Sequence, residues 1–426
     1  MKKFLALIIA LVMALSLVAC GEQKQPDTPD VPDDGEQTAT IKVGFITLHD
    51  ENSTYDLNFI NAAKEAIANL GLTENDYILK TNIEEGQKCY DTAAELADAG
   101  CNIIFADSFG HESYMIQAAK DFPNVQFCHS TGTRAHTENL PNYHNAFASI
   151  YEGRYLAGIA AGMKMNEMIE AGKFTADEAK MGYVGAFTYA EVVSGYTSFY
   201  LGAKSVCPTV TMDVTFTGSW YDETLEKEGA QKLIDGGCKL ISQHADSLGA
   251  PTACENAGIP NVSYNGSTQA AGPNTYIISS RIDWAPYYEM AIKAVMDGTE
   301  IPVDYTGDLK TGSVVLTDLN TAVAAEGTQA AIDEAMAKLE NGELHVFDCS
   351  TFTTSVELNP FKTDFLKVDA DGHITSYLAD VDTDADNAGD TEAISDGYFH
   401  ESEFRAAPYF NVQIDGINLL DQNFGS

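Results

Sequence analysis

Short apolar runs alternate with amphipathic stretches along most of the chain from residue 41. The run 41–47 (IKVGFIT) predicts a strand, and in the stretch after it apolar residues recur with helical spacing up to Gly71. The same pair recurs as far as the strand candidate at 275–280 and the helix candidate at 284–298. Strands that alternate with helices of this length predict an α/β fold, in which helices cover both faces of parallel sheets.

The pattern breaks near residues 142–180, and residues 41–426 are more than one domain normally holds. We therefore expect two lobes that meet at a cleft. The expected ranges are 41–150 for lobe I, completed by about 280–312, and 151–279 for lobe II, completed by about 313–347. Residues 348–426 are polar and rich in aspartate, and we expect them to form an acidic C-terminal extension on the second lobe.

The first 40 residues have a different pattern. Lys2 and Lys3 precede an apolar run that is too short to span a membrane, and Leu-Val-Ala-Cys follows it, which resembles the lipobox of bacterial lipoproteins. We expect 1–19 to be a signal peptide, Cys20 to carry the lipid, and 20–40 to be a disordered tether. The alternative is an ordinary secreted protein with a chance cysteine. The prediction is an extracytoplasmic protein, anchored to the cell membrane by its lipid.

The net charge limits the partners that the chain can bind, and the spacing of the cysteines limits the kinds of site that it can contain. The net charge of −39 repels nucleic acid and anionic lipid headgroups, so we expect no nucleic acid partner and expect the lipid alone to anchor the protein. Besides Cys20 there are seven cysteines, without CxxC or zinc spacing. Several lie in apolar runs, where a free cysteine behaves as a small buried hydrophobe.

Signatures of catalysis and of cofactor binding are scarce. GxGxxG, GxxxxGK[ST], GxSxG and HExxH are all absent from the sequence. The acidic run from Asp380 to Glu392 imitates a calcium loop, but Ala385 and Thr391 stand where that loop needs glycine and glutamate. We therefore expect a solvated acidic loop, no metal, no cofactor and no catalytic residues.

Aromatic and polar residues follow the predicted strands, at the edge where open α/β sheets bind ligands. Tyr55 and Trp220 belong to opposite lobes, so closure could bring their rings onto the two faces of one flat heterocycle. Carboxylates and amides nearby could read the donors and acceptors of that ring. The candidate ligand-binding residues are Tyr55, Asp107, Ser108, Phe109, Glu191, Trp220, His244, Asp246 and Asn265.

Several stretches resemble the basic-membrane-protein family, the substrate-binding lipoproteins of ABC transporters that include purine nucleoside receptors. The main ones are KVGFIT (42–47), IIFADSFG (103–110), YEGRYLAGIAAG (151–162), FTGSWYDETLEKEGAQKLIDGG (216–237) and QHADS (243–247). The resemblance implies the type I periplasmic-binding-protein fold, with two Rossmann-like lobes joined by a hinge. It also implies a monomeric, non-enzymatic receptor that delivers its ligand to an ABC permease and ATPase complex.

The family places an aromatic residue at the positions of Tyr55 and Trp220 to sandwich a purine. Nucleoside-binding members carry aspartates where this chain has Asn265 and Ser267, and a lysine where it has Ile282 beside Arg281. Arg281 is therefore a further candidate, and the ligand is a purine base or a nucleoside. Two alternatives stay open: a sensor of the same fold for a sugar or another small signal, and a nucleoside hydrolase.

Overall fold

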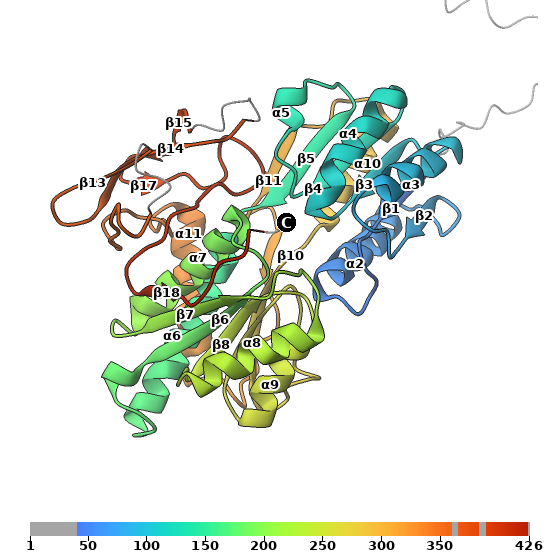
Figure 1. Cartoon of the computed structure of the whole chain (residues 1–426). Helices are drawn as coiled ribbons and strands as arrows, with labels where there is room; N and C mark the ends of the chain where they lie inside the picture. The colour runs from blue at the N-terminus through green and yellow to red at the C-terminus, as the bar shows by residue number, and fades with distance from the viewer. Residues whose placement is uncertain (1–40, 360–364, 383–388, 425–426) are drawn as a thin grey trace, which may run out of the picture. The chain divides into compact units, whose positions relative to one another are not determined.

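The computed structural model describes residues 41–359, 365–382 and 389–424. Residues 41–426 form one compact unit that contains two large sheets, each flanked by helices (Figure 1). The predicted signal peptide, Cys20 and the tether lie outside the described residues. Among the described helices, none is long and apolar enough to cross a membrane.

The first sheet has six parallel strands in the order β11-β5-β4-β3-β1-β2. Its strands are β1 (Val43–Ile46), β2 (Tyr77–Lys80), β3 (Ile103–Ala106), β4 (Gln126–Ser130), β5 (Tyr143–Ala148) and β11 (Asp304–Gly307). Its helices are α2 (Thr54–Asn69), α3 (Gln87–Asp98), α4 (Glu112–Asp121), α5 (Ala135–Glu138) and α10 (Ala285–Asp297). Short 3-10 turns lie at η1 (Phe109–His111) and η2 (Ala176–Glu178).

The second sheet has seven strands in the order β12-β10-β9-β8-β6-β7-β18, and only β12 runs antiparallel to its neighbour. Its strands are β6 (Lys180–Gly185), β7 (Thr211–Phe216), β8 (Leu240–His244), β9 (Asn261–Tyr264), β10 (Tyr276–Ile282), β12 (Val314–Leu316) and β18 (Ile417–Leu419). Its helices are α6 (Ile150–Glu170), α7 (Ala190–Val206), α8 (Glu223–Asp235), α9 (Gly249–Ala257) and α11 (Thr328–Asn341). The predicted α/β class with parallel sheets is confirmed.

The chain passes between the sheets three times. It leaves the first sheet between β5 and α6, returns between β10 and α10, and leaves again between β11 and β12. β10 therefore belongs to the second sheet, whereas α10 packs on α2 beside the first sheet. The lobe boundaries drawn from the sequence stay a prediction, because the compact unit is not divided further.

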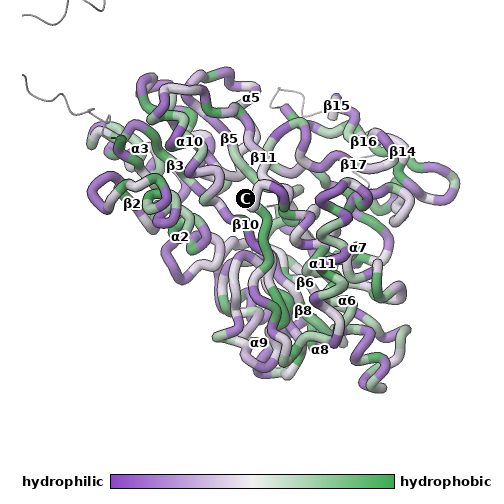
Figure 2. Tube along the Cα trace, turned by 180° about the vertical axis from the view of Figure 1, so that it is seen from behind, coloured by the Kyte–Doolittle hydropathy of each residue, from purple (hydrophilic) through white to green (hydrophobic). Residues whose placement is uncertain are grey.

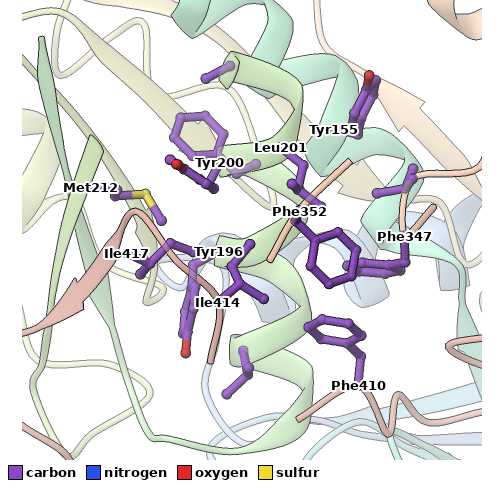
Figure 3. Packing of buried hydrophobic residues seen from close by; sticks show 14 of the residues in the cluster. Tyr155, Tyr196, Tyr200, Leu201, Met212, Phe347, Phe352, Phe410, Ile414 and Ile417 are labelled. Atoms are coloured by element: carbon purple, nitrogen blue, oxygen red, sulfur yellow. The ribbon is translucent and has the colours of Figure 1, made fainter. Parts of the chain in front are cut away.

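The C-terminal extension packs closely on the second sheet. Its strand β18 pairs in parallel with β7, and two of its buried aromatic rings, Phe352 and Phe410, belong to the same hydrophobic cluster as Phe347 and as Tyr196 and Tyr200 of α7 (Figure 3). Smaller antiparallel strands complete it: β13 (Leu366–Val368), β14 (Ile374–Ala379), β15 (Thr391–Glu392), β16 (Ile394–Ser395) and β17 (Tyr398–Phe399). Part of the predicted acidic loop, 383–388, lies outside the described residues.

Apolar residues concentrate along the buried strands, whereas polar residues predominate in the outer loops (Figure 2). The seven cysteines among the described residues are free and buried, which extends to all of them the burial that the apolar runs predict for several. Burial raises the pKa of the Cys128 thiol to about 12, so this thiol stays protonated at neutral pH. No group of three or more metal-ligating side chains occurs within the described parts of the chain.

Candidate ligand-binding site

A cavity lies where the carboxyl ends of strands from both sheets meet. Its first wall comes from the first-sheet side and consists of Leu48, His49, Tyr55, Asp56, Ser108, Phe109 and Thr131. Its second wall comes from the second-sheet side and consists of Glu191, Trp220, His244, Asp246 and Asn265. Eight of the ten candidates from the sequence line this cavity, and the two that do not are Asp107 and Arg281.

Tyr55 enters the cavity from the first turn of α2. Ser53 caps this helix by accepting the Asp56 N–H, which fixes the direction in which Tyr55 leaves the backbone. The Tyr55 hydroxyl donates to the backbone oxygen of Asp107 at 2.7 Å, and its ring packs edge-on against Phe59. The ring is therefore held from both ends, in a position to present a face to a ligand.

Two carboxyl groups of the first-sheet side, Asp56 and Asp107, are almost completely buried. Burial raises the pKa of Asp56, but hydrogen bonds from His49 and Ser53 outweigh it and leave the pKa lowered. Burial, followed by the Asp56 charge, raises the pKa of Asp107 well above its ordinary value. The surroundings of Asp107 therefore favour its neutral form. It accepts the Leu48 N–H at 3.1 Å and lies behind the lining residues.

Trp220 reaches the cavity from the loop between β7 and α8. Its ring packs at 5.1 Å from Phe187 and at 6.1 Å from Tyr189, which lie on the loop between β6 and α7. Phe187 and Tyr189 stack on each other at 5.2 Å. Trp220 is thus the cavity-lining member of an aromatic cluster that two neighbouring loops build.

Asp246 and Asn265 form the polar part of the second wall. The Asn265 amide donates to Asp246 Oδ1 at 2.9 Å, which leaves Oδ2 outside this bond. Asn265 adopts a left-handed backbone conformation, with φ at 66°, which asparagine tolerates better than most residues. Burial, followed by the Glu226 and Asp56 charges, raises the pKa of Asp246 well above its ordinary value. A ligand N–H donor facing Asp246 would favour its charged form.

His244 and Glu191 lie beside this pair. His244 Nε2 is 3.4 Å from Glu191 Oε1, and Nδ1 is 3.4 Å from the Tyr183 hydroxyl. That hydroxyl accepts from the buried Arg154 guanidinium at 3.1 Å. Burial lowers the pKa of His244, so its ring is neutral at pH 7.

The two sides of the cavity also contact each other directly. The Thr54 N–H at the start of α2 donates to the Asp246 carbonyl at 2.9 Å, and the Thr54 hydroxyl donates to the same oxygen at 3.1 Å. The rings of Phe109 and Tyr189 pack at 5.4 Å across the junction. A free backbone N–H at the start of a helix on one side is therefore hydrogen-bonded by a backbone carbonyl of the other side.

Arg281 lies apart from the cavity lining, and its guanidinium donates to Asp283 at 3.1 Å. Four lining residues were not predicted: Leu48, His49, Asp56 and Thr131. The Ser53–Asp56 spacing is a capping signal that could have identified Asp56. Thr131 carried no signal, because its unusual left-handed conformation, with φ at 69°, follows from the fold around it.

Several known proteins are similar to this chain in sequence. A purine-binding protein of Brucella abortus is 32% identical over 72% of this chain and 83% of its own length. A putative ABC transporter glucose-binding protein of Haloferax volcanii is 33% identical over 61% of this chain and 62% of its own. An ABC transporter nucleoside-binding protein of Lactococcus lactis, BmpA, is 24% identical over 57% of this chain and 64% of its own length.

Among solved structures, an ABC transporter solute-binding protein of Aeropyrum pernix superposes with a TM-score of 0.62 at 18% identity, over 76% of this chain and 96% of its own. An ABC transporter solute-binding protein of Conexibacter woesei superposes with a TM-score of 0.58 at 22% identity, over 72% of this chain and 98% of its own. These likenesses confirm the predicted periplasmic-binding fold. The family model of PnrA-like ABC transporter substrate-binding proteins matches residues 44–346, and the chain therefore belongs to this family.

Proposed function

We propose that this chain binds a purine base or nucleoside between its two walls and delivers it to an ABC permease and ATPase complex. The observation that carries the proposal is that two aromatic side chains from opposite walls, Tyr55 and Trp220, line one cavity together with the carboxyl group of Asp246. A flat heterocycle matches this combination, because rings stack on its faces while a carboxyl accepts its N–H groups. The purine-binding and nucleoside-binding relatives support the same ligand class.

In this proposal the protein is a non-enzymatic monomer, held outside the cytoplasm by a lipid on Cys20. Ligand contacts to both walls favour the closed arrangement, which the permease then recognises. Incorporation of labelled palmitate in cells tests the anchor. Wild type should be labelled, whereas Cys20→Ala should not be, and label that persists in the variant would contradict lipidation at Cys20.

Calorimetric titration tests the ligand. The wild-type protein is titrated with adenine, guanine, hypoxanthine, inosine and glucose. Trp220→Ala should weaken binding of the preferred purine by about 10- to 100-fold, because stacking of one base on one aromatic ring contributes roughly 1–3 kcal/mol. Trp220→Phe, the matched control, keeps a ring and should lose less. Undiminished purine affinity in Trp220→Ala would end the proposal.

A sugar is the second candidate, because the relative from Haloferax volcanii is named a putative glucose-binding protein. Glucose binding without purine binding in the same titrations would favour it. Incubation with inosine and analysis for free hypoxanthine tests the enzymatic alternative, for which we expect no product.

A further inference from the structure

The last strand of the C-terminal extension and the residues after it, 417–423, lie against the two loops that carry the aromatic cluster. We propose that Asp421 and Asn423 are positioning residues that hold Trp220 in place through these loops. The effect on ligand affinity rests on the proposed function, whereas the effect on the Trp220 ring does not. Residues 417–423 do not line the cavity, so any influence on the ligand must pass through other residues.

The segment is first anchored to β7. β18 pairs with β7, and the Leu420 N–H extends the ladder by donating to the Val214 carbonyl at 2.8 Å. The Asp421 carboxylate then accepts from the Phe216 N–H at 2.8 Å, from the Thr215 hydroxyl at 2.6 Å and from Lys232 at 2.8 Å. Asp421 thus fixes the end of β7, four residues before Trp220.

Burial raises the pKa of Asp421, but the hydrogen bonds from Lys232, Thr215 and Phe216 outweigh it and leave the pKa below its ordinary value. The carboxylate therefore stays charged at neutral pH. All three hydrogen bonds are consequently charge-assisted, which makes them stronger than bonds between neutral groups.

The segment next bonds to the loop between β6 and α7. The Thr188 N–H donates to the Asn423 carbonyl at 2.6 Å, and the Asn423 N–H donates to the Thr188 hydroxyl at 2.9 Å. Thr188 is buried and stands between Phe187 and Tyr189, the two rings that pack against Trp220. This reciprocal pair of bonds fixes the backbone from which both rings project.

The segment also contacts the Trp220 loop itself. Gly218 has a left-handed conformation with φ at 76°, and a Cβ atom placed there would lie 2.3 Å from Asn423 Nδ2. Only glycine allows this close approach without displacing the asparagine. The Gly218 N–H donates to the Ala186 carbonyl at 2.8 Å, which joins this loop to the loop that carries Thr188.

These contacts form a continuous support behind the second wall. It leads from β18 through Asp421 and Asn423 to Thr188 and Gly218, and from there to the rings around Trp220. The family match ends at residue 346, so β18, Asp421 and Asn423 belong to a part of the chain that the family model does not cover.

The experiment uses the full chain with Trp284→Phe as a common background, so that Trp220 is the sole tryptophan. Thr188→Val keeps the shape of the side chain and removes the acceptor of the Asn423 N–H. Time-resolved fluorescence anisotropy should then show faster local rotation of Trp220, about two- to fivefold. Affinity for the purine that the background protein binds best should fall about three- to tenfold. Thr188→Ser restores the hydroxyl and should rescue both quantities.

Asp421→Asn provides a second variant in case Thr188→Val folds poorly. It keeps an acceptor for the Phe216 N–H and loses the charged bond to Lys232, so the same changes should appear at smaller size. Unchanged rotation of Trp220 in both variants would overturn the proposal. Faster rotation without any purine binding, even in the background protein, would instead support the positioning role and contradict the proposed ligand.

Discussion

The two walls of the cavity use buried carboxyl groups in different ways. On the first-sheet side, Asp56 accepts hydrogen bonds from His49 and Ser53, and Asp107, whose pKa burial raises, lies behind the lining. In the second wall, Asp246 bonds to Asn265 through one oxygen and lines the cavity. Asp107 and Asp246 each follow a strand, β3 and β8, yet Asp107 lies behind the lining whereas Asp246 lines the cavity.

The largest expected difference is in ligand affinity when the same substitution is made on each side. Asp246→Asn should weaken purine binding by about 10- to 100-fold, because a hydrogen bond to a charged acceptor contributes roughly 1.5–3 kcal/mol. Asp107→Asn should change affinity by less than about threefold, since Asp107 does not line the cavity and its backbone bond to Tyr55 is retained. Calorimetric titration of both variants measures the contrast. Equal losses would show that both sides read the ligand.

The next effect is on stability and depends on pH. Because the folded-state pKa of Asp107 is raised, its stabilising contribution is complete below the unfolded pKa of about 4 and is lost as pH rises through the folded value. Asp107→Asn mimics the neutral acid, because its amide carries no charge at any pH in this range. The free energy of unfolding of the variant should therefore match that of wild type near pH 4 and be larger than that of wild type at pH 8.

Urea unfolding at the two pH values provides this measurement. Asp56→Asn is the contrasting variant, because the pKa of Asp56 is lowered and its charge stabilises the fold at neutral pH. It should be less stable than wild type at pH 8. If Asp107→Asn is also destabilised at pH 8, Asp107 must be charged there, and the proposed difference between the two sides does not hold.

The smallest effect concerns the hydroxyl of Tyr55. Tyr55→Phe removes the 2.7 Å bond to the Asp107 carbonyl and keeps the ring, so affinity should fall only about two- to fivefold. Tyr55→Ala removes the ring as well and should cost roughly as much as Trp220→Ala. Competition binding against the preferred purine resolves such differences. An equal loss of affinity in Tyr55→Phe and Tyr55→Ala would indicate that the hydroxyl, and not the ring, contacts the ligand.

Much of the fold could be predicted because its signals are local. Strands such as β1 and β3 are buried over their whole length and read as continuous apolar runs, and helices with regular apolar spacing separate them. The extension gave no such signal. Phe352 and Phe410 share one hydrophobic cluster but are far apart in sequence, and the three-residue strand β18 exists only because β7 offers an edge to pair with.

The candidate site could be predicted as far as strand ends determine it. Trp220, His244 and Asp246 line the cavity because parallel strands deliver the residues after them to one edge. Arg281 is a candidate because it stands beside the position of a family lysine, but a sequence position does not show which neighbour a long side chain will reach, and its guanidinium donates to Asp283. The support from Asp421 to Thr188 joins residues more than 200 positions apart, which periodicity cannot reveal.

The bond from the Thr54 N–H to the Asp246 carbonyl bears on the kinetics of uptake. It joins the two sides through protein groups alone. Part of the free energy that favours the closed arrangement is therefore independent of the ligand. In the proposed function, capture would then wait for spontaneous separation of the two sides, and the association rate would fall below the diffusion limit. The same bond would slow dissociation of the ligand once the two sides have met. The receptor would then bind its ligand more slowly and hold it for longer.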